Sequence, residues 1–350
     1  MFDLKAFREQ SLPTQSQIIS QWEGNLTSPV VSVICTSFNQ ESYIEDALKG
    51  FLIQRTDFPF EIIIHDDAST DSTADIINDY AKKYPLIIKP ILQKNNQYSI
   101  SGHLPFINAV NASSGEFLAL CEGDDFWVDK NKIQLQYDTL NASPDIDLCF
   151  TSALMLENDK CIGTTASFEA NEKVFPIETV IRKGGGFMPT VSLFLRAYIL
   201  DSNFFESIDA APVGDYYVQI YSSLKGGALY RKAITSVYRV NAINSWSENI
   251  KNKDSISKID SWVKGHEGAL INILMHNVDV NVEKDIKYSI SMFYLFAAKR
   301  AFKLGLINEA NSYMEKIDKE VFNLNIKEYC FYIVIKFLSK QPFTNVFKFK

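Results

Sequence analysis

Acidic side chains gather directly after short apolar segments of this chain of 350 residues. The densest group, Glu122-Gly123-Asp124-Asp125, follows the apolar residues 117–121. Carboxylates this close repel one another unless a positive charge lies among them. A hard divalent cation meets that need, and such an ion usually keeps substrate phosphates among its ligands. A solvated acidic turn or a helix cap explains the same residues about equally well.

Two further polar groups have similar positions. His65-Asp66-Asp67-Ala68-Ser69-Thr70-Asp71 follows the apolar residues 61–64, and Asp215 precedes an amphipathic segment. One carboxylate is enough to cap a helix, so the three in residues 65–71 suggest contacts to a ligand such as a base or a ribose. Asp215 is equally compatible with a helix cap and with a general base.

The elements that must position these groups alternate along the first third of the chain. Apolar, β-branched runs at 30–35, 61–64 and 117–121 predict buried strands, and 87–92 predicts a weaker edge strand because of Pro90. Helical periodicity lies between them at 44–52, 76–81 and 104–112. This alternation predicts an α/β fold with a mainly parallel central sheet, whose ligands bind beyond the carboxyl ends of the strands.

The remainder of the chain has a different pattern. Residues 145–250 are mixed, with a glycine triplet at 184–186, strand-like stretches at 191–195 and 233–240, and a helix after Asp215. From about residue 255 the pattern is helical, with a hairpin that turns at Gly305. We therefore expect an N-terminal extension over 1–28, an α/β domain over 29–250 divided at residue 130, and a C-terminal helical region over 251–350.

Composition narrows the class of protein. The net charge of −7 argues against nucleic acid as a partner. Neither a signal-peptide core nor a run of about 18 apolar residues is present, and five widely spaced cysteines favour a reducing compartment. These features predict a cytoplasmic protein.

Three segments, in their order and spacing, resemble family 2 glycosyltransferases. Residues 31–39 resemble the opening strand and loop of that family. Asp66-Asp67-Ala68-Ser69-Thr70-Asp71 is similar to its Asp-Asp-Gly-Ser-x-Asp run, with Ala68 in place of Gly. Glu122-Gly123-Asp124-Asp125 is similar to its Asp-x-Asp-Asp metal motif, with Glu122 in place of Asp. The resemblance covers about residues 30–250 and implies an A-type, Rossmann-like fold, with a donor half over 29–130 and an acceptor half over 131–250.

The resemblance also implies roles for residues. In the donor half, Thr36, Phe38 and Asp66 would surround the uracil of a uridine diphosphate donor, with Asn39 and Asp67 in the same binding set. Asp124 would bind the ribose or the metal, and Asp125 and Glu122 would complete a Mn²⁺ or Mg²⁺ site. Which of the three carboxylates contacts the metal stays open.

In the acceptor half, the resemblance implies that Asp215 is the general base of an inverting transfer. The glycine loop with Gly185, Gly186 and Met188, together with Tyr216 and Trp246, would face the acceptor. Asn241 stands where relatives often carry a histidine, which leaves a fourth metal ligand open.

The expected reaction is transfer of one sugar, because the Gln-x-x-Arg-Trp motif and membrane helices of polymer-forming relatives are absent from the sequence. The acceptor would be a saccharide or a polyprenyl-diphosphate-linked saccharide in bacterial capsule or O-antigen synthesis. The basic, aromatic residues 329–350 predict peripheral contact with the inner face of the cytoplasmic membrane, or else a packed helix or oligomer surface. A sugar nucleotidyltransferase is the alternative enzyme, although residues 36–40 lack its glycines and basic side chains. A non-catalytic nucleotide- or sugar-binding module is the other alternative.

Overall fold

The computed structural model describes residues 2–243, 255–276 and 281–340. The chain divides into two compact units. The first comprises Met1–Val180, Gly185–Phe205 and Val213–Glu248, and the second comprises Ile181–Gly184, Glu206–Pro212 and Asn249–Lys350. The polar groups that the sequence singles out lie in the first unit.

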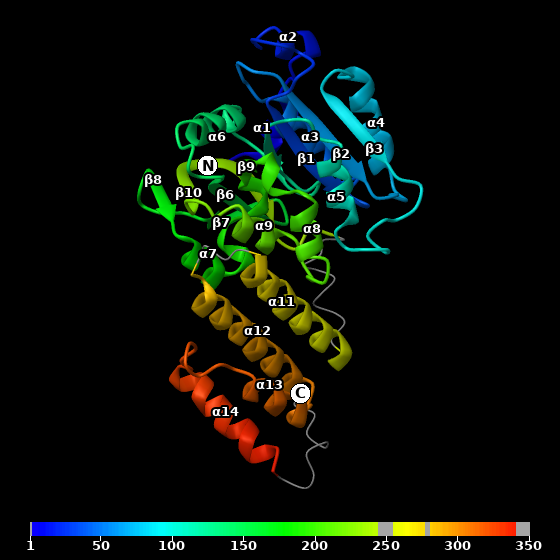
Figure 1. The fold of residues 1–350 in the computed structure, drawn as a ribbon. Helices are drawn as coiled ribbons and strands as arrows, with labels where there is room; N and C mark the ends of the chain where they lie inside the picture. Colours follow the sequence, from blue (N-terminus) through cyan, green and yellow to red (C-terminus); the bar gives the residue numbers. More distant parts are fainter. Residues whose placement is uncertain (1, 244–254, 277–280, 341–350) are drawn as a thin grey trace. The chain divides into compact units, whose positions relative to one another are not determined.

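A sheet that has ten strands within the described residues forms the centre of the first unit (Figure 1). The strand order is β3-β2-β1-β4-β9-β6-β10-β5, with β7 paired to β6 and β8 paired to β10. The strands are β1 (Val31–Ser37), β2 (Phe60–Asp66), β3 (Ile88–Leu92), β4 (Phe117–Leu120), β5 (Phe126–Trp127), β6 (Leu148–Glu157), β7 (Lys160–Thr165), β8 (Glu172–Phe175), β9 (Phe194–Arg196) and β10 (Ala228–Arg239).

The first four strands of this order are parallel, as the sequence predicts. The residues of β2 and β4 are all buried, which explains their continuous apolar runs. Helices α3 (Ile44–Leu52), α4 (Thr73–Lys83) and α5 (Leu104–Asn111) provide the crossovers. Strand β3 ends the order, so Pro90 lies on an edge strand, and this prediction is confirmed.

Beyond β4 the sheet is mixed. Strand β9 runs antiparallel to both β4 and β6, whereas β6 and β10 are parallel. The α/β fold class is confirmed, with the parallel arrangement holding for β3-β2-β1-β4. The other helices of the central region are α6 (Lys132–Asn141), α7 (Ile177–Lys183), α8 (Ser202–Ser207) and α9 (Asp215–Tyr221), with 3₁₀ turns η1 (Gly185–Phe187), η2 (Thr190–Ser192) and η3 (Ala197–Ile199).

The N-terminal segment has more structure than its polar composition indicates. It forms α1 (Leu4–Glu9), capped by Asp3, and α2 (Gln15–Ile19), which begins with a capping box at Thr14. Phe7 and Ile18 are buried, and the Phe7 ring lies 4.9 Å from that of Phe126. A few apolar residues in a polar sequence are therefore enough to attach this segment to the sheet.

The second unit is helical, with α11 (Ile256–His276), α12 (Glu283–Lys303), α13 (Ile307–Glu315) and α14 (Ile326–Leu338) around their own apolar core. Gly305, with φ +77°, separates α12 from α13, which confirms the predicted turn. None of the helices among the described residues combines the length and the apolar character needed to cross a bilayer.

Candidate functional site

The loops after β1, β2 and β4 meet at one edge of the sheet. The parallel register pairs Ser37 with Asp66 and Ile34 with Leu120, so these strands end side by side. Backbone hydrogen bonds continue past the strand ends, from Cys121 N to Ile34 O and from Gly123 N to Thr36 O. The structure thus brings the first two sequence-predicted polar groups together.

Asp66 and Asn39 join the β1 and β2 loops through Ser69. The Asp66 carboxylate accepts from Ser69 Oγ at 2.5 Å and from Ser69 N at 3.0 Å, and Asn39 N donates to Ser69 Oγ at 2.9 Å. Asn39 Oδ1 accepts from Thr70 N at 2.8 Å. Ala68 has φ +62°, a left-handed conformation that favours glycine. The family's usual glycine therefore corresponds to a backbone requirement that this chain meets with alanine.

Asp67 holds a loop. It is buried, and its two carboxylate oxygens accept from Gln97 N at 2.6 Å and from Tyr98 N at 2.9 Å. The carboxylate that the sequence placed in the donor-binding set is thus engaged by the segment after β3. Phe38, by contrast, is 40% exposed, so its ring is available for stacking.

The acidic residues 122–125 differ in exposure. Glu122 and Asp124 are half-buried, whereas Asp125 is buried. Asp125 Oδ1 accepts from Arg239 N at 2.7 Å, and Oδ2 is buried without a hydrogen-bond partner among the described residues. A Cβ added at Gly123 would lie 2.3 Å from Gln40 Oε1 and 3.0 Å from Ser37 Cβ, so a larger residue here would require the Gln40 side chain to move. The backbone of the acidic motif thus packs closely against the loop that follows β1.

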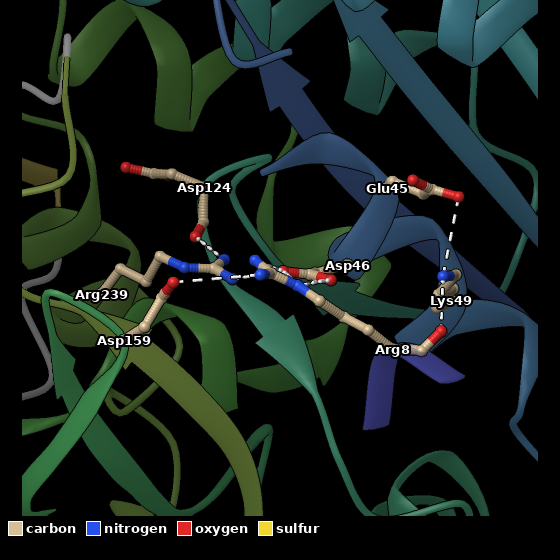
Figure 2. A network of polar contacts seen from close by, with 7 residues as sticks. All are labelled: Arg8, Glu45, Asp46, Lys49, Asp124, Asp159 and Arg239. Carbon is tan, nitrogen blue, oxygen red and sulfur yellow. Dashed lines mark hydrogen bonds and ion pairs between the residues drawn. The ribbon is translucent and has the colours of Figure 1, made fainter. Parts of the chain in front are cut away.

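Arg239, at the end of β10, forms hydrogen bonds with the acidic motif through its side chain as well as its backbone. Its Nη1 donates to the Asp124 carbonyl at 2.5 Å and its Nη2 donates to Asp46. The guanidinium lies over the Phe126 ring, 4.5 Å from its centroid. Figure 2 shows the Asp124 carboxylate pointing away from Arg239, and the Gln40 side chain donates a hydrogen bond to this carboxylate. The sequence carries no local signal for the role of Arg239, because its partners Asp46, Asp124 and Phe126 lie more than a hundred residues away.

Arg8 of α1 extends this network. It shares Asp46 with Arg239, donating through Nε at 3.0 Å and through Nη2 at 2.7 Å (Figure 2). The Arg8 carbonyl accepts from Lys49 Nζ at 2.8 Å. Asp46 is buried between two guanidinium groups, so its negative charge is compensated.

The acidic motif has unusual protonation equilibria. Burial, followed by repulsion from Asp124 and Asp215, raises the pKa of Glu122 to about 8. Burial also raises the pKa values of Asp124 and Asp125, the latter further because of its two acidic neighbours. Tyr238 of β10 has a pKa raised to about 12 by burial and by all four carboxylates. Tyr238 thus lies near the four carboxylates, a proximity for which the sequence has no local signal.

Asp215 begins α9 and lies within electrostatic reach of Glu122. Its Oδ1 accepts from Tyr216 N at 2.8 Å, and burial raises its pKa. Gly185 faces it, since a Cβ added to Gly185 would lie 3.6 Å from Asp215 Oδ2. The structure therefore places the predicted base near both the acidic motif and the glycine loop.

The glycine loop is held by α9. Gln219 Nε2 donates to the carbonyls of Gly185, at 2.8 Å, and Met188, at 3.0 Å. The Met188 and Tyr216 side chains are about 1% exposed, so neither is accessible to an acceptor in this structure. Gly186 has open space around its Cα, which leaves the loop backbone accessible. Trp246 lies outside the described residues.

The carboxylates fit a cation whose ligand set is completed by substrate. Within the described ranges, no three side chains of His, Cys, Asp or Glu converge into a metal site. The unpartnered Asp125 oxygen and the raised pKa values nevertheless indicate excess negative charge at this edge. Mg²⁺ and similar ions are commonly bound by one or two carboxylates plus substrate phosphates. Asn241, where relatives often carry a histidine, donates to Glu157 at 2.7 Å.

Comparison with known proteins identifies this arrangement. Residues 32–173, which include the three donor-side loops, match the family model "Glycosyl transferase family 2". The chain contains a family 2 glycosyltransferase domain. Its donor half has the strand order and loop positions described above, and the predicted family is confirmed.

Relatives of this family 2 domain occur in several bacteria. An uncharacterized protein of Mycobacterium tuberculosis is 34% identical over 220 residues, which cover 62% of this chain and 60% of that protein. The putative teichuronic acid biosynthesis glycosyltransferase TuaG of Bacillus subtilis is 34% identical over 110 residues, covering 31% of this chain and 41% of TuaG. The chain thus matches about 60% of the length of the first of these relatives.

Solved structures share the fold of the family 2 domain. The crystal structure of Staphylococcus aureus TarS in complex with UDP has a TM-score of 0.60 to this chain at 18% identity. The alignment covers 83% of this chain and 82% of the TarS chain. This likeness confirms the A-type glycosyltransferase fold that the motifs predicted.

Proposed function

We propose that this protein is a metal-dependent, inverting glycosyltransferase that moves one sugar from a nucleotide-diphosphate donor, a UDP-sugar, to a saccharide or polyprenyl-diphosphate-linked saccharide. The observation that carries the proposal is the approach of Asp215 to the acidic residues 122–125 at the carboxyl edge of a parallel sheet. Similarity to TuaG supports a role in bacterial surface-polysaccharide synthesis, and similarity to TarS, whose structure holds UDP, supports the choice of nucleotide.

On the donor side, the chain provides an aromatic ring and polar groups that could bind a nucleotide base. Phe38 would stack on the uracil, with Thr36 and Asn39 beside it. Asp66 would act mainly by keeping the β1 and β2 loops together through Ser69. A Mn²⁺ or Mg²⁺ ion held by Asp124 and Asp125, with Glu122 nearby, would supply positive charge to the departing diphosphate.

On the acceptor side, Asp215 would remove the proton of the acceptor hydroxyl as its oxygen bonds to the anomeric carbon. The bond between that carbon and the diphosphate breaks in the same step, which inverts the configuration. The raised pKa of Asp215 makes its carboxylate a stronger base than an exposed carboxylate, which favours removal of the acceptor's proton. Gly185 lies against the start of α9, where an added Cβ would be 3.2 Å from Tyr216 Cβ and 3.6 Å from Asp215 Oδ2, so the glycine loop adjoins the proposed base.

The test is turnover of a panel of UDP-, GDP- and dTDP-sugars with Mn²⁺, using isolated lipid-linked oligosaccharides and simple saccharides as acceptors. We expect release of UDP and formation of a glycoside of inverted configuration. Synthesis of a nucleoside triphosphate from pyrophosphate would instead identify a nucleotidyltransferase. Binding of a nucleotide sugar without turnover of any acceptor would identify a non-catalytic module.

Metal binding should depend strongly on pH. A carboxyl whose folded pKa exceeds its unfolded value binds more protons when folded, so stability falls as pH rises between the two values. For Glu122 this window runs from 4.5 to about 8. A cation replaces these protons, so the rise in Tm caused by Mn²⁺ plus UDP should be larger at about pH 9 than at about pH 6.

Thermal unfolding with and without Mn²⁺ and UDP measures this effect, and Asp125→Asn is the matched variant. The variant should show a smaller rise in Tm and less dependence on pH. Equal rises at both pH values in the native protein and the variant would contradict a metal role for the motif.

A further inference from the structure

Helix α14 has apolar side chains on two faces. Ile335 is buried in the helical core, with Phe331 and Tyr332 packed against that core. A second set is exposed and recurs at helical spacing, so that it forms one stripe along the opposite face. We call it the α14 stripe, and it consists of Ile326, Tyr329, Cys330, Ile333, Val334 and Phe337. Ile326 is 84% exposed and Phe337 is 64% exposed, so a continuous apolar surface is exposed to solvent along this face of α14.

Lysines border the α14 stripe. At about 100° per residue, Lys327 and Lys336 fall on opposite sides of it, and both are exposed. The one acidic residue of α14, Glu328, belongs to the other face, where it caps the helix start with Asn325 and lies 3.3 Å from Lys299. The stripe therefore has cations at its borders and no anion.

The same bias continues along the sequence. Residues 326–350 contain five lysines and one glutamate, although the whole chain has a net charge of −7. They also contain seven of its aromatic residues. The C-terminal segment thus combines positive charge with apolar and aromatic surface within an acidic protein.

We propose that the α14 stripe binds the anionic headgroup surface of a lipid bilayer. An interfacial helix inserts its apolar face at the boundary of headgroups and acyl chains, while flanking lysines contact anionic lipids. The Lys336 ammonium lies 5.5 Å from the Tyr332 ring centroid and donates to the Tyr332 hydroxyl at 3.3 Å, which places this charge at the border of the α14 stripe. At 13 residues, α14 lies on the membrane, because a span needs about 20.

The charges favour lipid over a second copy of the chain. In a symmetric dimer the same patch meets itself, so the lysines that border one stripe would face those of the other. Like charges facing each other across an interface oppose association. This inference does not depend on the proposed transferase chemistry, so vesicle binding and turnover can fail separately.

Cosedimentation of the full chain with vesicles tests the proposal. We expect binding to phosphatidylcholine vesicles that contain phosphatidylglycerol, weaker binding to pure phosphatidylcholine, and loss of the difference at high salt. Ile333→Asp with Phe337→Asp should lower partitioning into both vesicles by roughly tenfold or more. Lys327→Glu with Lys336→Glu should lower partitioning into anionic vesicles by roughly tenfold or more and leave neutral vesicles almost unaffected.

The control variant is Lys258→Glu with Lys284→Glu, which makes the same charge change at exposed positions in the first turns of α11 and α12. It should bind as the native protein does, and circular dichroism should show all variants folded. The proposal is overturned if the native chain does not partition, or if the stripe variants partition unchanged. It is also overturned if light scattering shows that the stripe variants convert a dimer to a monomer while vesicles bind neither form.

Discussion

Replacing Asp215 with asparagine is expected to lower turnover by on the order of 10²–10⁴-fold. The amide keeps the size of the side chain and its contact with Tyr216 N, but it cannot take a proton from the acceptor hydroxyl. Steady-state kcat with saturating donor and acceptor measures the change. Asp75→Asn, which alters an exposed aspartate in the first turn of α4, is the matched control and should leave kcat unchanged.

The pH profile adds a second test of Asp215. A base must be deprotonated, so activity should fall as pH decreases through its pKa, and burial places that pKa above the ordinary value. The native enzyme should therefore lose activity at a higher pH than an exposed carboxylate would. Near-native turnover by a folded Asp215→Asn protein, with the acidic limb unchanged, would exclude Asp215 as the base.

Replacing Arg239 with methionine should have the largest effect on stability, lowering the free energy of unfolding by roughly 3–5 kcal/mol. Methionine retains part of the packing on Phe126 but leaves Asp46 buried with Arg8 as its remaining partner. The Asp124 carbonyl also loses a donor, so the acidic motif should shift and turnover should fall. Denaturant unfolding and kcat, measured on the same preparation, quantify the two effects.

Three other variants separate charge from geometry. Arg239→Lys keeps the charge but loses the planar fork, so it should recover only part of the stability. Adding Asp46→Asn to Arg239→Met removes the buried charge and should restore some of the loss. Arg231→Met, on the same strand, breaks a surface ion pair with Glu172 and should cost about 0–1 kcal/mol. Equal stability of the Arg239 and Arg231 variants would contradict the role given to the network.

The donor half of the fold could be predicted from sequence because burial on both faces leaves a strong local signal. The apolar runs at 30–35, 61–64 and 117–121 each correspond to a parallel strand. The strands after β4 gave weaker signals, since β5 has only two residues and β7 is largely exposed. Its mixed pairing depends on contacts between distant segments, which a local pattern does not encode.

The carboxylates were enough to predict where the site lies, but not which contacts each of them makes. Sequence order indicates which strand ends carry acidic residues, yet not that the Asp67 carboxylate is engaged by backbone N–H groups of a distant loop. Lys132 shows the same limit. A lysine is ordinarily assigned to the surface, but this one is buried, with Nζ 4.4 Å from the Trp127 ring centroid and a hydrogen bond to Gln136.

The shared carboxylate of Asp46 has a consequence for how the protein is made. Arg8 and Asp46 are separated by 38 residues, whereas Arg239 follows Asp46 by 193. Phe7, next to Arg8 in α1, packs with Phe126, Leu156 and Val237, so the native position of α1 requires β5, β6 and β10. Both guanidinium groups therefore reach their native positions around Asp46 only after β10 has been synthesised. The contacts that support residues 122–125 are thus completed late in translation, by segments from both ends of the α/β unit.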